Sequence, residues 1–497
     1  MRITNKMMTN NMMSNINKNK LSMTALEQQY STGKKIQKPS DDPIVTVRAL
    51  KLRTNLSELS QYYEKNIPDA KSWMDVTESA LTTVNDILKQ INSKCVQGST
   101  DTLTASDRTA IVQSLEQMKD QIYQEGNTNY AGRYVFTGYK TDSTLTFTEA
   151  TPNLSYSITE EFTGEQIQII NKISGGYNLE DFDNTSITFD EAPQMKDTYR
   201  IQLSYDKLDS TPPENIRYYI KSDTGEMVEQ APIEPIVLKS AADGDAYTPA
   251  PGTVNYIQET GELILSSERY DDLRKADKME ITYSKTGFEE GELKPEHYFN
   301  CVMTDNSKPE VDAVEYKKES QQIEYEINYN QKIKVNTEGT DAISHQIGRH
   351  INDILNAVNE VTATEQKIAE VDKRLTDTSL SEADKQRYEK LKEQLDTELE
   401  LKKEAMQQAF EKGITVSSKE QDRVNTAVAD LGSRYVRLEL SENRLSSQKV
   451  DFEDLLSKNE DVDMVDTVIK YNSAETIYNA SLNAASRVVQ NTLLDFL

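Results

Sequence analysis

The sequence predicts a multidomain α+β protein. Long antiparallel terminal helices form a coiled-coil bundle around an inserted β-rich domain, with an extra α-hairpin in the C-terminal half. Apolar residues recur at helical spacing in both terminal regions. The middle of the chain changes to short alternating runs rich in β-branched and aromatic residues. The 497 residues also exceed the roughly 250–300 that one hydrophobic core serves, so we expect several domains.

The changes in periodicity divide the chain into five segments. Residues 1–40 are predicted as an N-terminal helix, 41–133 as the N-terminal half of the bundle, and 134–338 as one or two inserted β-rich outer domains. Residues 339–460 are the C-terminal half, with a coiled-coil hairpin near 361–410, and 461–497 are a final helix. Heptad spacing alone does not distinguish this hairpin from one longer bundle helix.

The N-terminal helix carries a single apolar stripe at intervals of three, four or seven residues. Its members are Met12, Ile16, Met23, Leu26 and Tyr30. Asn19 interrupts the stripe, and a polar residue in such a seam commonly fixes register at some cost in stability. We therefore predict that this face pairs with another helix in one register.

Turn and cap signals mark where helices begin and end. The helix should end near Gly33, and Asp42 with Pro43 predicts a new helix, because Asp caps free amides and Pro suits the first helical position. Pro68 should kink or restart the helix that follows. Ser381 and Asp384 resemble a capping box at the start of the second hairpin arm.

The middle region reads as strands, because short alternating runs are separated by Gly, Asp and Pro. The runs are 134–139, 144–147, 167–170, 199–205, 216–220, 236–238, 262–265, 279–283 and 323–335.

The C-terminal region returns to heptad spacing, first at Val424, Leu431, Leu438, Leu445 and Phe452. The final helix continues the apolar pattern. Its proposed contact residues are Tyr471, Tyr478, Leu482, Ala485, Val489, Leu494, Phe496 and Leu497. An apolar end of this kind needs a partner, either the N-terminal stripe or a neighbouring molecule.

Composition argues against several classes of function. The formal charge of −27 would repel nucleic acid and anionic membrane surfaces, and no run of about 18 apolar residues could span a membrane. The first 20 residues lack the features of a Sec signal peptide. Cys95 and Cys301 are too far apart in sequence to suggest a disulfide framework, and three histidines without HExxH spacing give no metal site.

An enzyme would need a recognisable constellation, and the acidic pairs offer only adjacency. Glu160 beside Glu161, and Glu289 beside Glu290, are expected as solvated turns and faces in so acidic a chain. No GxSxG, Walker or dinucleotide-binding motif is present. We therefore assign no catalytic, cofactor-binding or metal residues and expect no cofactor.

Specific motifs at both ends resemble the flagellar hook-associated protein of type three, the hook–filament junction family within the flagellin-like superfamily. The N-terminal motifs are Met1-Arg2-Ile3-Thr4, Ser31-Thr32-Gly33-Lys34-Lys35-Ile36, Pro39-Ser40-Asp41-Asp42-Pro43 and Gly132-Arg133-Tyr134-Val135-Phe136-Thr137-Gly138. The C-terminal motifs are Tyr478-Asn479-Ala480-Ser481-Leu482 and Leu494-Asp495-Phe496-Leu497. The middle region and residues 365–412 carry no matching motif.

The resemblance implies a secreted structural protein that forms a ring of identical subunits at the junction and connects the hook to the flagellin filament, as motility requires. Residues 1–40 and 461–497 would then be assembly helices. The implied partners are a neighbouring hook-associated junction protein, flagellin, and a cytoplasmic export chaperone at residues 471–497, with type III export. Flagellin itself and a secreted adhesin remain alternatives.

Overall fold

The computed structural model describes residues 5–100, 103–177, 182, 189–190, 192–222, 225–308, 310, 312–376 and 380–494. Its contacts divide the chain into two compact units. The first unit comprises Met1–Ala70, Tyr325–Ile333 and Val436–Leu497. The second comprises Lys71–Glu324 and Lys334–Tyr435. The predicted α+β class, with terminal helices flanking a β-rich middle, is confirmed.

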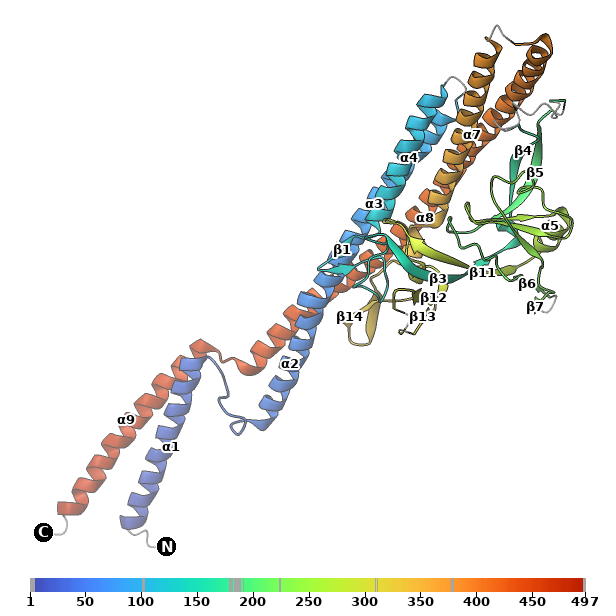
Figure 1. The fold of residues 1–497 in the computed structure, drawn as a ribbon. Coiled ribbons are helices and arrows are strands. Elements are labelled where there is room, and N and C mark those ends of the chain that lie inside the picture. Colours follow the sequence, from blue (N-terminus) through green and yellow to red (C-terminus); the bar gives the residue numbers. More distant parts are fainter. Residues whose placement is uncertain are drawn as a thin grey trace. The chain divides into compact units, whose positions relative to one another are not determined.

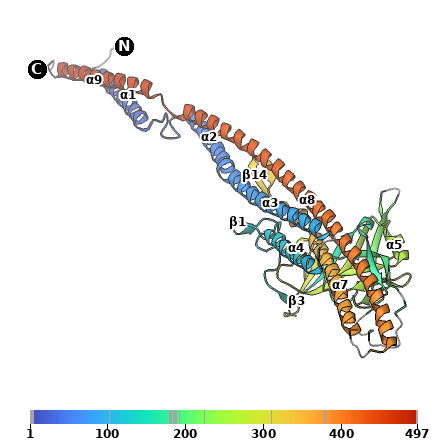
Figure 2. The same ribbon diagram turned by 90° about the horizontal axis from the view of Figure 1, so that it is seen from above.

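The first unit is mainly helical. It contains α1 (Asn5–Thr32), α2 (Pro43–Gln61), the π-helix η1 (Tyr62–Asn66), the start of α3 (Ile67–Gly98), the end of α8 (Glu382–Glu460) and α9 (Met464–Leu494). Most of the hairpin of β14 (Glu324–Asn328) and β15 (Gln331–Lys334) also belongs to it. Both views show α1 beside α9 (Figures 1 and 2).

Asp42 caps α2 as predicted, and a π-helical turn precedes Pro68. The Asp42 carboxylate accepts the backbone N–H groups of Ile44 and Val45 at 3.0 and 3.1 Å, and Pro43 takes the first helical position. Residues 43–98 are helical throughout, and η1 lies immediately before Pro68. The wider π-turn leaves room for a residue that has no backbone donor, and α3 begins at Ile67, next to Pro68, which agrees with a restart at this point.

The second unit contains the remaining helices. They are most of α3, α4 (Ala105–Glu125), α5 (Ser267–Leu273), α6 (Gly339–Ala342), α7 (His345–Leu375) and the first part of α8. Ser381 Oγ accepts the Asp384 N–H at 3.1 Å and so caps α8 as predicted. The hairpin of α7 and α8 buries Ile347, Ile354 and Val361 on one arm and Leu391 and Leu395 on the other.

Two sheets form the β-rich part of the second unit. The six-stranded sheet has the order β13 (Val314–Tyr316), β12 (Asn300–Asp305), β3 (Thr151–Phe162), β11 (Lys278–Phe288), β6 (Ile216–Lys221), β7 (Met227–Glu229). The five-stranded sheet has the order β4 (Gln168–Ser174), β5 (Gln194–Gln202), β10 (Glu262–Leu265), β9 (Val254–Ile257), β8 (Ile236–Lys239). Neighbouring strands are antiparallel except β8 and β9. A short pair, β1 (Asn129–Tyr130) and β2 (Arg133–Tyr134), precedes them.

Side chains from both sheets form one core, which includes Tyr156 and Ile158 of β3, Leu263 of β10, and Met279 and Ile281 of β11. The expected strands at 134–139 and 144–147 are wrong. The first is limited to Tyr134 at the end of β2, and the second contains a single bridge from Thr146 to Leu293.

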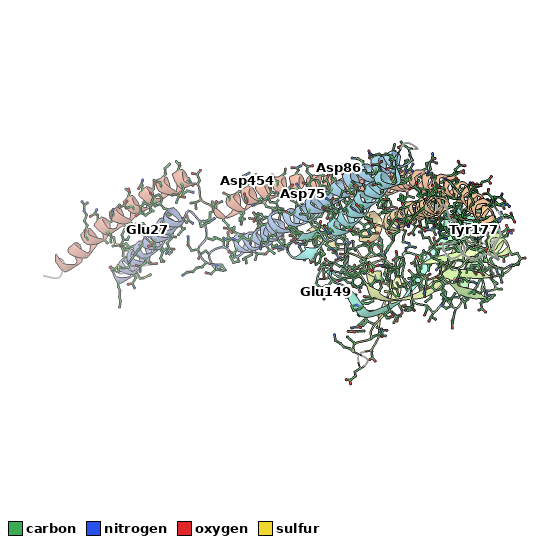
Figure 3. All side chains as sticks on the ribbon, turned by 45° about the horizontal axis from the view of Figure 1, so that its top comes forward. Glu27, Asp75, Asp86, Glu149, Tyr177 and Asp454 are labelled. Atoms are coloured by element: carbon green, nitrogen blue, oxygen red, sulfur yellow. The ribbon has the colours of Figure 1, made fainter. Side chains whose placement is uncertain are left out.

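Acidic residues occur both on the surface and in the core. Glu27 and Asp454 in the first unit, and Asp75 and Glu149 in the second, are exposed (Figure 3). Glu160, expected in solvent, is instead 3% exposed, and it accepts hydrogen bonds from the Tyr283 hydroxyl and from the Ser204 N–H and hydroxyl. An inward-facing carboxylate is tolerated there because three donors replace its hydration.

Candidate assembly interface at the paired terminal helices

Helices α1 and α9 pair in an antiparallel register. Asn19 Nδ2 donates to Ser481 Oγ at 2.8 Å, and the rings of Tyr30 and Tyr471 stack with centroids 6.4 Å apart. Asn19 and Tyr30 are 11 residues apart on α1, and their partners Ser481 and Tyr471 are 10 residues apart in the opposite direction on α9.

The predicted contact residues lie on both helices, and many of them face the intramolecular seam. Ile16 is buried, and Met12, Met23, Leu26, Tyr471, Tyr478 and Ala485 are half-buried. Tyr30 and Leu482 are exposed by 48% and 41%. The side chains of Val489 and Leu494, together with Phe496 and Leu497, lie outside the described residues.

A backbone joint closes the far end of this helix pair. Gly33 ends α1 with φ +70°, a left-handed conformation that suits glycine. Its carbonyl accepts the Val462 N–H at 3.0 Å, while the Lys35 N–H donates to the Glu460 carbonyl at 2.7 Å. The turn after α1 is therefore paired, strand-like, with the junction of α8 and α9.

Charged side chains reinforce the joint. The buried Glu460 carboxylate accepts from Arg53 Nη2 at 2.6 Å and lies 3.4 Å from Lys34 Nζ. Lys34 also reaches Asp461 at 2.5 Å, and this hydrogen bond raises the pKa of Lys34 and lowers that of Asp461. The hydrogen bond that Arg53 donates to Glu460 raises the pKa of Arg53. Each charged group lies next to a group of opposite charge, so all of them stay ionised at neutral pH and stabilise the joint.

Further exposed apolar residues, not among the predicted contact residues, form a second set. They are exposed by 44% or more, and they are Met7, Met8, Met13 and Leu21 on α1, Ile44, Val47 and Leu50 on α2, and Met464, Val465, Ile469 and Ile477 on α9. Single exposed apolar residues are common, but so many on three helices of one unit are typical of an interaction surface. In the sequence, the only indication of this surface was that these residues are apolar although they are not among the predicted contact residues.

The described residues contain no group of three or more His, Cys, Asp or Glu arranged to hold a metal ion, and none of their helices is long and apolar enough to cross a membrane. Buried Cys95 and Cys301 are both free thiols.

Family comparisons assign the two ends of the chain. Residues 3–141 match the bacterial flagellin N-terminal helical region, and residues 416–497 match the bacterial flagellin C-terminal helical region. The two ends are thus similar to the helical regions of flagellin, and we call them the flagellin-type regions. In this chain the flagellin-type regions contain α1, α9 and the joint between them.

Individual relatives place these flagellin-type regions nearer to hook-associated proteins than to flagellins. Flagellar hook-associated protein 3 of Salmonella typhimurium is 34% identical over 144 residues, which make up 29% of this chain and 45% of that protein. Flagellin of Clostridium tyrobutyricum is 31% identical over 126 residues, 25% of this chain and 33% of that protein. The predicted resemblance is confirmed, and the chain spans less than half the length of these relatives.

Among solved structures, flagellar hook-associated protein 3 of Legionella pneumophila aligns at 12% identity with a TM-score of 0.30. The alignment covers 82% of this chain and 97% of that one.

Proposed function

We propose that this protein is a structural, non-catalytic component of the bacterial flagellum that assembles at the hook–filament junction, connects the hook to the flagellin filament and is required for motility. The observation that carries the proposal is the presence of flagellin-type regions at both ends. Their similarity to hook-associated protein 3 is longer and higher than to the flagellin of Clostridium tyrobutyricum. Flagellin itself is the second candidate, because both relatives share these regions.

Assembly would use two faces of the same helix pair. The inner seam, with Ile16 and Tyr471, holds α1 to α9 within one subunit. The outer apolar residues, such as Val465 and Ile469, are free to pack against neighbouring molecules. Burying apolar area contributes about 25 cal/mol per Å², so many moderate contacts stabilise a ring without one dominant residue.

The partners follow from this role. We propose further copies of the chain in a ring, a neighbouring hook-associated junction protein on one side and flagellin on the other. Before export, a cytoplasmic chaperone would cover residues 471–497, since unpartnered apolar helices aggregate. Export would proceed unfolded through the flagellar type III apparatus, and the protein would be secreted to the flagellum.

Deleting the gene tests the proposal directly. The expected result is hooks without filaments in electron micrographs, with flagellin monomers released into the medium. Intact filaments would contradict a junction role. A filament subunit would behave differently, because its loss leaves hooks but also removes the main flagellin from the medium.

Complementation with matched variants tests the mechanism. Leu482→Asp places a charge on an exposed apolar position of α9 and should block filament attachment while the subunit stays folded. Asn483→Asp adds the same charge to the neighbouring exposed residue without removing apolar surface, and should support motility. Leu26→Asp changes the inner seam. It should block filament attachment and also separate α1 from α9. Normal attachment with Leu482→Asp would overturn the outer-face mechanism.

A further inference from the structure

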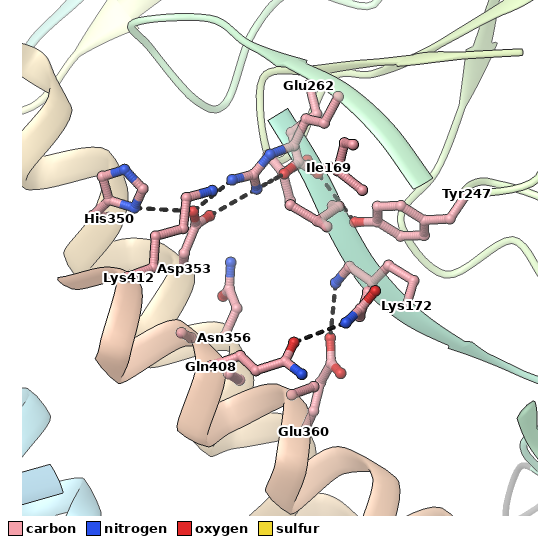
Figure 4. Close-up of a pocket in the computed structure, with 17 residues that line it drawn as sticks. Ile169, Lys172, Tyr247, Glu262, His350, Asp353, Asn356, Glu360, Gln408 and Lys412 are labelled. Atoms are coloured by element: carbon pink, nitrogen blue, oxygen red, sulfur yellow. Dashed lines mark hydrogen bonds and ion pairs between the residues drawn. The ribbon is translucent and has the colours of Figure 1, made fainter. Parts of the chain in front are cut away.

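A cavity of about 190 Å³ lies inside the second unit, between β4 and the helices α7 and α8 (Figure 4). Ala357 of α7 and Ala405 and Ala409 of α8 form part of its wall, and these small side chains leave the space open. Opposite them lie Ile169 and Ile170 of β4. The cavity is larger than an apolar cavity of about 150 Å³ that accommodates benzene, so a molecule of roughly six to eight non-hydrogen atoms would fit.

The carboxylates around this cavity are already neutralised. Asp353 receives both terminal nitrogens of Arg200, at 3.0 and 2.7 Å, and Glu262 receives Arg200 at 2.5 Å. Glu360 is paired with Lys172 at 3.2 Å. Figure 4 shows these pairs along the cavity wall. A cation entering the cavity would therefore have to displace an existing ion pair.

Part of the hydrogen-bonding capacity left over belongs to donors. Arg200 has a side chain only 4% exposed, and its Nε–H finds no acceptor among the described residues. The Lys412 ammonium has three N–H groups, and its one hydrogen bond in the described part of the chain goes to the neutral Gln168 Oε1 at 2.8 Å. The Gln408 amide oxygen accepts from Asn171 at 2.8 Å, which leaves its NH₂ group beside the cavity. Unsatisfied buried donors favour an acceptor ligand.

The Lys412 ammonium hydrogen-bonds to a neutral amide, so its charge can pair with an anion. Burial lowers the pKa of Lys412 to about 8, and the like charge of Arg200 adds to this effect against the opposing charges of Asp353 and Glu262. His350, the remaining titratable neighbour, is neutral at pH 7 because burial lowers its pKa to about 4. A bound anion would offset the repulsion between the two cations.

We propose that this cavity is a binding site for a small organic carboxylate with a short apolar body. The carboxylate accepts hydrogen bonds from Lys412 Nζ and from the Gln408 NH₂ group, and the apolar body lies against Ala357, Ala405 and Ala409. A carboxylate fits better than a phosphate, because the alanine wall offers phosphate oxygens no donors. The site is independent of the assembly helices, so it stands or falls separately from the junction role.

Calorimetric titration of the full chain at pH 7 tests the site with three probes: butyrate, its neutral isostere butyramide, and inorganic phosphate. Butyrate should bind with a Kd of about 1 mM or tighter, and butyramide and phosphate at least tenfold more weakly. Equal binding of butyrate and butyramide, binding of phosphate in preference to butyrate, or no binding of butyrate would each overturn the proposal.

Variants locate the site. Lys412→Met should weaken butyrate binding at least tenfold, whereas Lys419→Met, an exposed lysine on the same helix, should leave it unchanged. Ala409→Leu fills the cavity and retains every charge, so it should abolish butyrate binding. This variant tests the location of the site even if Lys412→Met fails to fold. Unchanged binding in Ala409→Leu would overturn the assignment.

Proton linkage gives a further readout. At pH 8.5 the Lys412 amine is partly deprotonated, and carboxylate binding should draw a proton from the buffer. The measured heat should then depend on the ionisation enthalpy of the buffer in the natural protein and lose that dependence in Lys412→Met. The same buffer dependence in both proteins would contradict the role of Lys412.

Discussion

The buried carboxylate of Glu460, the last residue of α8, accepts a hydrogen bond of 2.6 Å from Nη2 of Arg53 on α2. The two residues are 407 positions apart in the sequence. Lys34, from the turn after α1, approaches the same oxygen at 3.4 Å. One carboxylate therefore links three segments of the first unit, and its loss should be felt at the joint between them.

Removing Arg53 should loosen the joint more than neutralising Glu460. Arg53→Met leaves a buried carboxylate with only the longer contact to Lys34, at a cost of about 1–2 kcal/mol. Glu460→Gln removes the charge and keeps a hydrogen-bond acceptor, so its cost should be below about 1 kcal/mol. Hydrogen exchange at the Lys35 and Val462 amides measures the local opening, which should accelerate roughly tenfold in Arg53→Met.

The control for this pair is an ion pair at the surface. Lys458→Met breaks the exposed contact between Lys458 and Asp454, and the exchange of both amides should stay within about twofold. Faster exchange in Glu460→Gln than in Arg53→Met would show that the charge of Glu460, and not its burial, dominates.

Asn19 should define the register of α1 against α9. Asn19→Leu extends the apolar seam and should raise the thermal stability of the first unit, while the specific hydrogen bond to Ser481 is lost. Spin labels at the exposed positions Glu27 and Glu475 would then give a broader distance distribution than in the natural protein. Asn15→Leu, at an exposed position on the same helix, is the control. An unchanged distribution in Asn19→Leu would mean that apolar packing alone sets the register.

Buried histidines should make the second unit sensitive to acid. Burial lowers the pKa of His297 and His345 to about 3 and that of His350 to about 4, below the usual value near 6.5. Between these values the unfolded chain binds more protons than the folded one, so stability is present above pH 6.5 and is lost as pH falls toward 4. Glu160 and Glu420 oppose this trend, because burial raises their pKa.

A single substitution isolates the effect of one histidine. His345→Gln should flatten the plot of unfolding free energy against pH, between pH 6 and 4, by about 1.4 kcal/mol per pH unit. The fluorescence of Trp73, the only tryptophan and a buried residue of the second unit, reports the unfolding by denaturant. An unchanged slope would mean that folding does not shift the pKa of His345.

Local signals in the sequence were sufficient for the helices and their caps. The stripe from Met12 to Tyr30 follows the helical period, and Asp42 satisfies amides two and three residues away. The joint has no such signal, because Arg53 and Glu460 meet only when the ends of the chain fold together. The cavity beside Lys412 depends in the same way on β4, α7 and α8 meeting. Long-range contacts of charged residues leave no periodic pattern to detect.

Several strands were missed, and in one of them, β3, the pattern was present. In β3, Tyr156, Ile158 and Glu160 alternate toward the core, while Ser155, Ser157 and Thr159 lie on the other face. Because Ser and Thr occupy the outer face, the alternation was not recognised. Glu160 was interpreted as a solvent-exposed residue because of its charge, although every second residue of a strand lies on the same face.

The buried position of Glu160 leads to the last prediction. Glu160→Ala leaves the Tyr283 hydroxyl and the Ser204 N–H without their acceptor inside the second unit, and should destabilise it by about 2–3 kcal/mol. Glu161→Ala removes the neighbouring carboxylate, which is 55% exposed and paired with Lys278 at the surface, and should cost no more than about 0.5 kcal/mol. Denaturant unfolding followed by Trp73 fluorescence measures both. Similar losses in the two variants would show that water replaces the Glu160 carboxylate without penalty, because the cavity that borders it admits solvent.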